Sequence, residues 1–174
     1  MKSCVGTLGP AGTNSELACK EYIFEKGLEG DVNLYPTPEL SIQALIKREI
    51  DVCILCVVYP KLNEIVFRNL DAIYLSDIYL LPTYAMVIAG DINATTYCSH
   101  PAPIDLIENG KHVEIVNSNA EAARLCKSGY FGACVTTKKA AEMYGLNIIK
   151  DYGEVPMGWA VFTRKNSIKI DKVA

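Results

Sequence analysis

Short apolar runs alternate with amphipathic segments along most of the chain. By their length and their β-branched residues, the apolar runs predict strands at residues 3–8, 31–35, 51–58, 94–98, 112–116, 132–135, 146–150 and 159–163. Apolar spacing of three to four residues, with capping residues in front and glycine behind, predicts helices at residues 14–25, 37–48, 101–109, 119–127 and 137–144. This alternation is typical of α/β proteins, and we expect predominantly parallel sheets covered by helices.

The middle of the chain departs from this alternation. Two extended runs follow one another at residues 70–78 and 84–89 and meet near Pro82, while residues 60–69 give no clear pattern. The extended connection at residues 79–86 and the late return at residues 151–157 predict two crossings between two lobes. We expect a single domain over residues 1–174, with a first lobe of about residues 1–80 and 155–174 and a second of about residues 81–154. Residues after Lys165 are expected to fray.

Composition and charge narrow the class of protein. Half of the 174 residues are hydrophobic, about a fifth are charged and the net charge is −3, as is ordinary for a globular protein with a full core. No run of Lys or Arg forms a basic stripe, so we expect no nucleic-acid partner. No apolar stretch approaches the ~20 residues that span a bilayer, and no leader precedes the strand at Ser3. We therefore expect a cytoplasmic protein without a membrane partner; a homodimer is compatible with the sequence.

Seven cysteines are scattered through apolar segments. Cys53 and Cys56 have the spacing of redox and zinc motifs, but they lie inside a predicted buried strand, where side chains three apart point to opposite faces. No second pair of this spacing exists, and the histidines are only His100 and His112. We expect reduced, buried thiols and neither a metal site nor a cofactor.

Three predicted strand-to-helix turns begin with hydroxyl and amide side chains. Their residues are Thr13, Asn14 and Ser15; Ser99 and His100; and Asn117, Ser118 and Asn119, with Glu121 completing a capping box. A helix N-terminus presents unpaired N–H groups and about half a positive charge, which suits a carboxylate or a phosphate. Because all three turns follow the carboxyl ends of predicted strands, we expect them to border an inter-lobe cleft that binds a molecule with two carboxylates.

Each candidate also has an interpretation without a ligand. Every one of these groups can be a plain helix cap, and Trp159 can be a core residue rather than a wall of the cleft. Thr136, ahead of the next helix, is a further candidate for the cleft. His100 could donate a proton, but a helix N-terminus disfavours its cationic form, so an orienting role is the stronger hypothesis.

The turns carry a family resemblance. Residues 9–18, Gly-Pro-Ala-Gly-Thr-Asn-Ser-Glu-Leu-Ala, resemble the opening motif of prephenate dehydratases, and Ser-His-Pro at 99–101, residues 118–123 and residues 132–146 resemble their later motifs in the same order. The resemblance covers nearly the whole chain. It implies an α/β fold of two lobes, like a type II periplasmic-binding protein, with prephenate in the cleft. It also places Thr136 at a position of the family's site.

Two segments depart from the dehydratase pattern. Residues 56–60, Cys-Val-Val-Tyr-Pro, stand where dehydratases carry Pro-Ile-Glu-Asn-Ser. Gly158 stands where their Thr-Arg-Phe signature has the threonine that is the favoured acid for expelling the ring hydroxyl. The resemblance gives no counterpart of the regulatory ACT domain, so we expect no feedback by phenylalanine.

A narrower group is more similar. The prephenate decarboxylases of bacilysin and anticapsin biosynthesis resemble this chain at residues 156–159 (Pro-Met-Gly-Trp), 99–103 (Ser-His-Pro-Ala-Pro) and 116–118 (Val-Asn-Ser). This resemblance implies a lyase of an antibiotic pathway that converts prephenate to dihydro-4-hydroxyphenylpyruvate and CO₂ without a cofactor, with Met157 and Trp159 at the substrate. His100 is the candidate for catalysis. The alternatives are a dehydratase that gives phenylpyruvate and a non-catalytic module that binds carboxylates.

Overall fold

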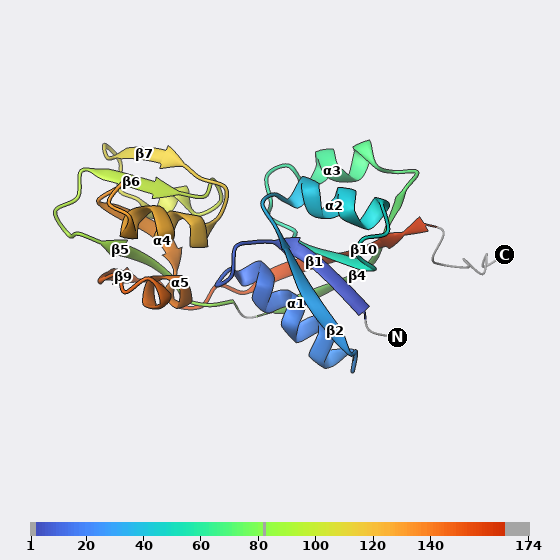
Figure 1. The fold of residues 1–174 in the computed structure, drawn as a ribbon. Helices are drawn as coiled ribbons and strands as arrows, with labels where there is room; N and C mark the ends of the chain where they lie inside the picture. The colour runs from blue at the N-terminus through green and yellow to red at the C-terminus, as the bar shows by residue number, and fades with distance from the viewer. Residues whose placement is uncertain (1–2, 82, 166–174) are drawn as a thin grey trace.

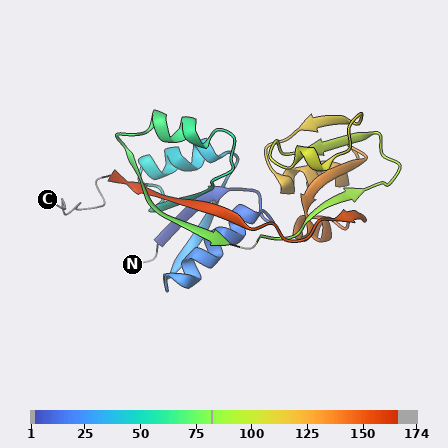
Figure 2. The same ribbon diagram turned by 180° about the vertical axis from the view of Figure 1, so that it is seen from behind.

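Two α/β lobes make up the computed structural model, which describes residues 3–81 and 83–165 (Figure 1). The segments that join β4 to β5 and β9 to β10 cross between the lobes side by side (Figure 2). Thr83 Oγ1 donates a hydrogen bond of 2.6 Å to Val155 O, so the two crossings are tied together. The predicted two-lobed α/β fold is confirmed. The predictions for Pro82 and for fraying after Lys165 lie outside the described residues.

The first lobe is built on a five-stranded sheet in the order β2-β1-β3-β10-β4. Its strands are β1 (Ser3–Leu8), β2 (Gly30–Tyr35), β3 (Val52–Cys56), β4 (Ile73–Leu81) and β10 (Met157–Arg164). Helix α1 (Asn14–Glu25) packs on one face, where Trp159 and Val161 are buried. Helices α2 (Pro38–Ile46) and α3 (Leu62–Arg68) pack on the other face, over Phe162.

The second lobe has its own five-stranded sheet, in the order β7-β6-β8-β5-β9. Its strands are β5 (Met86–Gly90), β6 (Thr96–Ser99), β7 (His112–Ile115), β8 (Ala133–Thr137) and β9 (Ile148–Asp151). Helices α4 (Asn119–Lys127) and α5 (Lys138–Met143) approach one face through buried alanines, among them Ala122, Ala123 and Ala140. The 3₁₀ turn η1 (Ile104–Leu106) lies on the opposite face of the sheet, and Leu106 packs against that opposite face.

Both sheets are mixed, so the prediction of predominantly parallel sheets is wrong. Strands β1, β2 and β3, and likewise β6, β7 and β8, pair in parallel, but β10 runs antiparallel to β3 and β4, and β5 runs antiparallel to β8 and β9. The two crossings are the reason. A strand that leaves a lobe and a strand that returns to it meet at the same end of the sheet and so run in opposite directions.

Two local predictions also change. The helix predicted at residues 101–109 is reduced to the three residues of η1, because Pro101 and Pro103 have no N–H to donate and Pro103 disfavours a helical Ala102. The unassigned residues 60–69 contain α3. Strand β4 extends to Leu81, beyond the predicted end at Ile78, because Met157 and Gly158 on the returning β10 pair with its last residues.

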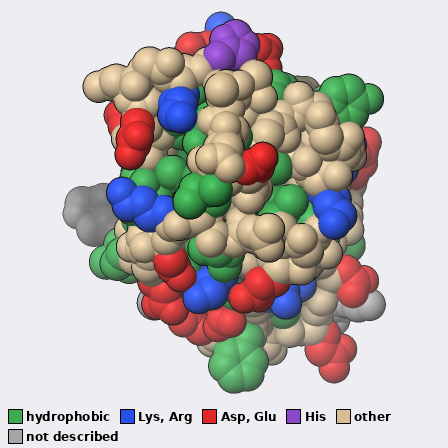
Figure 3. Space-filling model, turned by 90° about the vertical axis from the view of Figure 1, so that its left-hand side faces the viewer, with side chains coloured by type: hydrophobic (Ala, Val, Ile, Leu, Met, Phe, Trp, Pro, Cys, Tyr) green, Lys and Arg blue, Asp and Glu red, His purple; other side chains and the backbone are tan. Residues whose placement is uncertain are grey.

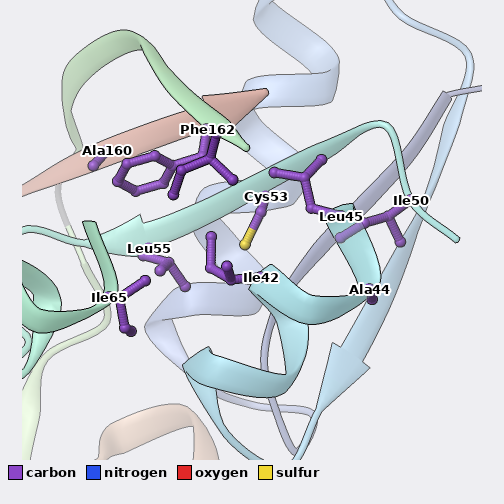
Figure 4. Packing of buried hydrophobic residues seen from close by; sticks show 10 residues of the cluster. Ile42, Ala44, Leu45, Ile50, Cys53, Leu55, Ile65, Ala160 and Phe162 are labelled. Atoms are coloured by element: carbon purple, nitrogen blue, oxygen red, sulfur yellow. The ribbon is translucent and has the colours of Figure 1, made fainter. Parts of the chain in front are cut away.

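The thiols of Cys53 and Cys56 point to opposite faces of β3, as the strand assignment predicted. Figure 4 shows Cys53 among Ile42, Leu45 and Leu55 on the face that α2 and α3 cover. Burial raises the pKa of Cys53 to about 12, so this thiol is protonated at neutral pH. Cys56 packs on the other face, and its Sγ donates to Met157 Sδ at 3.4 Å. All seven cysteines are free thiols.

Charges of both signs are interspersed on the surface of the second lobe that Figure 3 shows, with no basic patch on that face. None of the helices in the described ranges is long and apolar enough to cross a membrane.

Candidate functional site

A cavity of about 480 Å³ lies between the two lobes. Its described lining residues are Leu8, Thr13, Asn14, Ser15, Pro38, Leu55, Cys56, Val58, Tyr59, Met157 and Trp159 from the first lobe, and Met86, His100, Ala102, Pro103, Asp105, Leu106, Ser118, Asn119 and Val155 from the second lobe and the returning crossing. Eight predicted site residues are among them: Thr13, Asn14, Ser15, His100, Ser118, Asn119, Met157 and Trp159. Three others, Ser99, Asn117 and Thr136, are not among them.

The N-terminus of α1 forms one end of the cavity. Thr13 caps the helix, since its Oγ1 accepts from Glu16 N at 3.1 Å, and it also donates to Leu8 O at 3.2 Å. The first turn of the helix leaves N–H groups without partners inside the helix, and these lie beside the lining residues Asn14 and Ser15.

Two hydrogen bonds hold this turn against the rest of the molecule. Thr137 Oγ1, in the second lobe, donates to Gly12 O at 3.0 Å, and Tyr84 N donates to Asn14 Oδ1 at 2.9 Å. The turn is therefore positioned by the second lobe and by a crossing segment.

The N-terminus of α4 borders the same cavity from the second lobe. Ser118 Oγ accepts from Glu121 N at 3.1 Å, which confirms the predicted cap, whereas Glu121 Oε2 accepts from Asn117 N at 3.1 Å, one residue before the N–H that a capping box uses. Thr136, which does not line the cavity, donates to Asn119 O at 2.6 Å and so supports this turn from behind. The Oδ1 atom of Asn119 is buried without a hydrogen-bond partner among the described residues.

The predicted helix N-terminus at Ser99 is wrong. Ser99 is fully buried, and its hydroxyl donates to His100 O at 2.8 Å instead of capping a helix. Without the helix at residues 101–109, this turn offers no row of free N–H groups. Of the three helix N-termini that the sequence placed at the cleft, those of α1 and α4 border the cavity, and Pro38 at the start of α2 lines it as well.

His100 stacks on Tyr59 across the cavity, which brings the two lobes into contact. The ring centroids are 6.3 Å apart with an interplanar angle of 26°. Burial lowers the pKa of His100, so the ring is neutral at pH 7; the cause is burial rather than the predicted helix dipole. Ala102 N donates to His100 Nδ1 at 3.2 Å, so the proton of the neutral ring is on Nε2.

Tyr59 is held from its own lobe. Its hydroxyl donates to Glu39 Oε1 at 3.0 Å, and burial, with this bond, raises the pKa of Tyr59 to about 12. Sequence reasoning missed Tyr59, although it lies in the segment at residues 56–60 that departs from the dehydratase pattern. It also missed Asp105, because the turn that carries Asp105 was predicted to be a helix.

Strand β10 brings Met157 and Trp159 to the cavity. Trp159 is 1% exposed, and its Nε1 has no hydrogen-bond partner in the described part of the chain. Gly158 lies between them against Val57: a Cβ built at Gly158 would lie 2.8 Å from Val57 Cγ2. The two segments that depart from the dehydratase pattern are therefore in direct contact.

The electrostatics of the cavity come mainly from backbone groups. Among the described lining residues there is no Lys or Arg, and Asp105 is the only carboxyl. No group of three or more His, Cys, Asp or Glu side chains in the described ranges could hold a metal ion. The N-termini of α1 and α4 and largely apolar walls suit an organic anion with two carboxylates.

Comparisons with known proteins agree with this geometry. Residues 5–154 match the family model for prephenate dehydratase. A prephenate decarboxylase of Bacillus subtilis (strain 168) is 30% identical over 91% of this chain and 85% of that protein. A solved prephenate dehydratase from Arthrobacter aurescens, in complex with L-Phe, superposes with a TM-score of 0.68 at 12% identity, over 92% of this chain and 60% of its own. The periplasmic VFT2 domain of Bordetella pertussis BvgS gives a TM-score of 0.60 at 19% identity, over 94% of this chain and 81% of its own.

The structural likenesses concern the fold and agree with the predicted type II periplasmic-binding-protein architecture. The family model spans most of the chain and includes the turns that cap α1 and α4. This chain therefore belongs to the prephenate dehydratase family.

Proposed function

We propose that this chain is a prephenate decarboxylase that leaves the ring non-aromatic. Its similarity to the Bacillus subtilis prephenate decarboxylase supports this reaction. The observation that carries the proposal is the convergence of the α1 and α4 N-termini on one cavity from opposite lobes. Prephenate carries one carboxylate on ring carbon C1 and a second at the end of the pyruvyl arm on the same carbon, and the cavity offers a helix N-terminus from each lobe to bind them.

On this proposal, Thr13, Asn14 and Ser15 with their N–H groups bind one carboxylate, and Ser118 with Asn119 binds the other. The apolar side chains of Leu8, Leu55 and Met157 are available to pack against the ring. A hydrogen bond to a charged group contributes roughly 1.5–3 kcal/mol, and a helix N-terminus adds about 0.3–1 kcal/mol. These seats give useful affinity without a lysine or an arginine.

The proposed reaction breaks the bond between the ring and its carboxylate. The electron pair of that bond passes into the two neighbouring ring double bonds, CO₂ leaves, and one ring carbon takes up a proton. The competing aromatisation instead expels the ring hydroxyl, which needs an acid at its oxygen. Tyr59, with its pKa raised to about 12, and neutral His100, with its proton on Nε2, are both weak acids at pH 7. The Tyr59 hydroxyl already donates its proton to Glu39, so His100 Nε2–H is the group of the two that can donate a hydrogen bond while the hydroxyl stays on the ring.

We also propose the finer context that the sequence suggested. The resemblance to the decarboxylases of bacilysin and anticapsin biosynthesis supports an antibiotic pathway in the cytoplasm. On this proposal the substrate is prephenate, and the protein acts as a monomer or a homodimer.

One assay separates the three functions considered for this chain. Prephenate is incubated with the protein at pH 7.5, and CO₂ and ultraviolet spectra are recorded with the uncatalysed rate subtracted. We expect enzyme-dependent CO₂ release with negligible phenylpyruvate. Stoichiometric phenylpyruvate would instead identify a dehydratase. Binding without CO₂ release would identify a non-catalytic module.

A matched pair of variants tests the α4 seat. Ser118→Ala removes the hydroxyl beside the cavity, whereas Ser128→Ala removes a hydroxyl at the other end of the same helix, where it donates to Arg124 O at 3.0 Å. We expect Ser118→Ala to weaken prephenate binding by roughly 1–3 kcal/mol and Ser128→Ala to leave it unchanged. Equal affinities of the two variants for prephenate would show that the Ser118 hydroxyl does not bind the substrate.

A further inference from the structure

Trp159 has a buried N–H group without an acceptor. The side chain is 1% exposed, and Nε1 finds no partner among the described residues. Val161 and Ala18 in the same core cluster are apolar and have no side-chain acceptor to offer. An indole N–H only donates, and buried donors are almost always paired. Trp159 lines the cavity, so a molecule bound there can supply the missing acceptor.

Unpaired buried side-chain atoms are concentrated at this cavity. Three such atoms occur in the described part of the chain: Asn119 Oδ1, Trp159 Nε1 and Thr163 Oγ1. The first two belong to residues that line the cavity, one from each lobe. Backbone pairing of Trp159 with Cys56 on β3 and with Tyr79 on β4 fixes the strand that carries the indole. The donor is therefore preorganised.

We propose that Trp159 Nε1–H donates a hydrogen bond to the ring hydroxyl oxygen of the substrate and so selects ligands that carry this hydroxyl. This assignment rests on the proposed function, in which the α1 and α4 N-termini supply the donors for both carboxylates. The hydroxyl is then the remaining polar group of the ring. An indole N–H holds its proton at any physiological pH, so it can bind this oxygen without protonating it. Such a donor keeps the hydroxyl in place and does not promote its loss.

The test uses two stable ligands that differ only in this hydroxyl, 4-hydroxyphenylpyruvate and phenylpyruvate. Both are measured as competitive inhibitors of prephenate turnover by wild-type protein and by Trp159→Phe. We expect the wild type to prefer the hydroxylated ligand by roughly tenfold, and the variant to lose this preference. A merely structural role of Trp159 would change both inhibition constants together and leave their ratio intact. An unchanged ratio, or no inhibition by either ligand, overturns the assignment.

A second measurement uses the wild-type protein, so it does not depend on how well the variant folds. The chain has a single tryptophan, and its indole N–H gives a single cross-peak in a ¹⁵N–¹H spectrum. We expect this peak to move downfield with 4-hydroxyphenylpyruvate and much less with phenylpyruvate. If the backbone amides of Ser15 and Asn119 shift while the indole peak does not, the inference on Trp159 fails and the proposed site stands. If prephenate itself moves none of these peaks, the proposed function fails as well.

Discussion

Thr137 provides a sharp test of how the cavity is held together. This residue is fully buried, and its Oγ1 makes two hydrogen bonds: it accepts from Ala140 N at 3.1 Å to cap α5, and it donates to Gly12 O at 3.0 Å in the other lobe. Thr137→Val replaces the hydroxyl by a methyl group of similar size. The change therefore removes both bonds while nearly preserving the packing.

The expected loss follows from the two bonds. An N-cap contributes about 1 kcal/mol, and leaving a buried partner such as Gly12 O unpaired costs roughly 1–3 kcal/mol more. We expect Thr137→Val to lower the free energy of unfolding by about 2–4 kcal/mol. Thr37→Val is the matched control, since Thr37 caps α2 in the same way, accepting from Leu40 N at 3.2 Å. Within the described ranges its hydroxyl makes no bond to the second lobe, so about 1 kcal/mol is expected.

Urea unfolding at pH 7.5 measures both variants, with Trp159 fluorescence reporting on the first lobe and circular dichroism on the whole chain. The Michaelis constant for prephenate should also rise in Thr137→Val, because Gly12 directly precedes the α1 seat. Equal losses of stability in the two variants would refute the reasoning. The bond between the lobes would then contribute nothing beyond an ordinary helix cap.

Three further predictions concern the cavity wall. Gly158→Thr should lower the free energy of unfolding by roughly 1–3 kcal/mol, because its Cβ would lie 2.8 Å from Val57 Cγ2. Val57→Ala in the same chain should recover most of that loss in urea unfolding, whereas strictly additive losses would contradict the contact. Burial lowers the pKa of His100, so the stability due to its neutral form is present above the unfolded pKa of about 6.5 and is lost as the pH falls. His100→Asn, whose Oδ1 can still accept from Ala102 N, should therefore lose less stability than the wild type between pH 7.5 and 5.5; identical losses would show that His100 does not titrate as argued. Tyr59→Phe keeps the stacking on His100 and loses only the bond to Glu39, so the Michaelis constant should rise less than in Tyr59→Ala, and equal values would mean that the stacking does not hold the lobes together.

The sequence predicted best those features that are set by neighbouring residues. Thr13 and Ser118 cap helices whose first turn they also begin, so their type and spacing are sufficient evidence. Ser99 has the same local appearance, but the two prolines that follow it prevent the helix that it would cap.

Features that depend on residues far apart in the sequence could not be predicted from local patterns. The insertion of β10 between β3 and β4 makes the first sheet mixed, and no pattern within β10 reveals it. Val57 meets Gly158 only when β10 joins the first sheet, and Tyr59 meets His100 only when the two lobes come together. The unpaired N–H of Trp159 likewise becomes visible only when every neighbour of the indole is known.

The position of β10 also sets an order of assembly. Every strand of the second sheet lies within residues 86–151, so this lobe can close before the last strand of the chain is in place. The first sheet has to wait for residues 157–164, because β4 has no neighbour in it except β10. Until then the chain presents the open edges of β3 and β4, and Leu80 on β4 is 80% exposed even in the finished fold. That interval, after the second lobe has closed and before the last strand inserts, is when open strand edges make the chain most prone to aggregation.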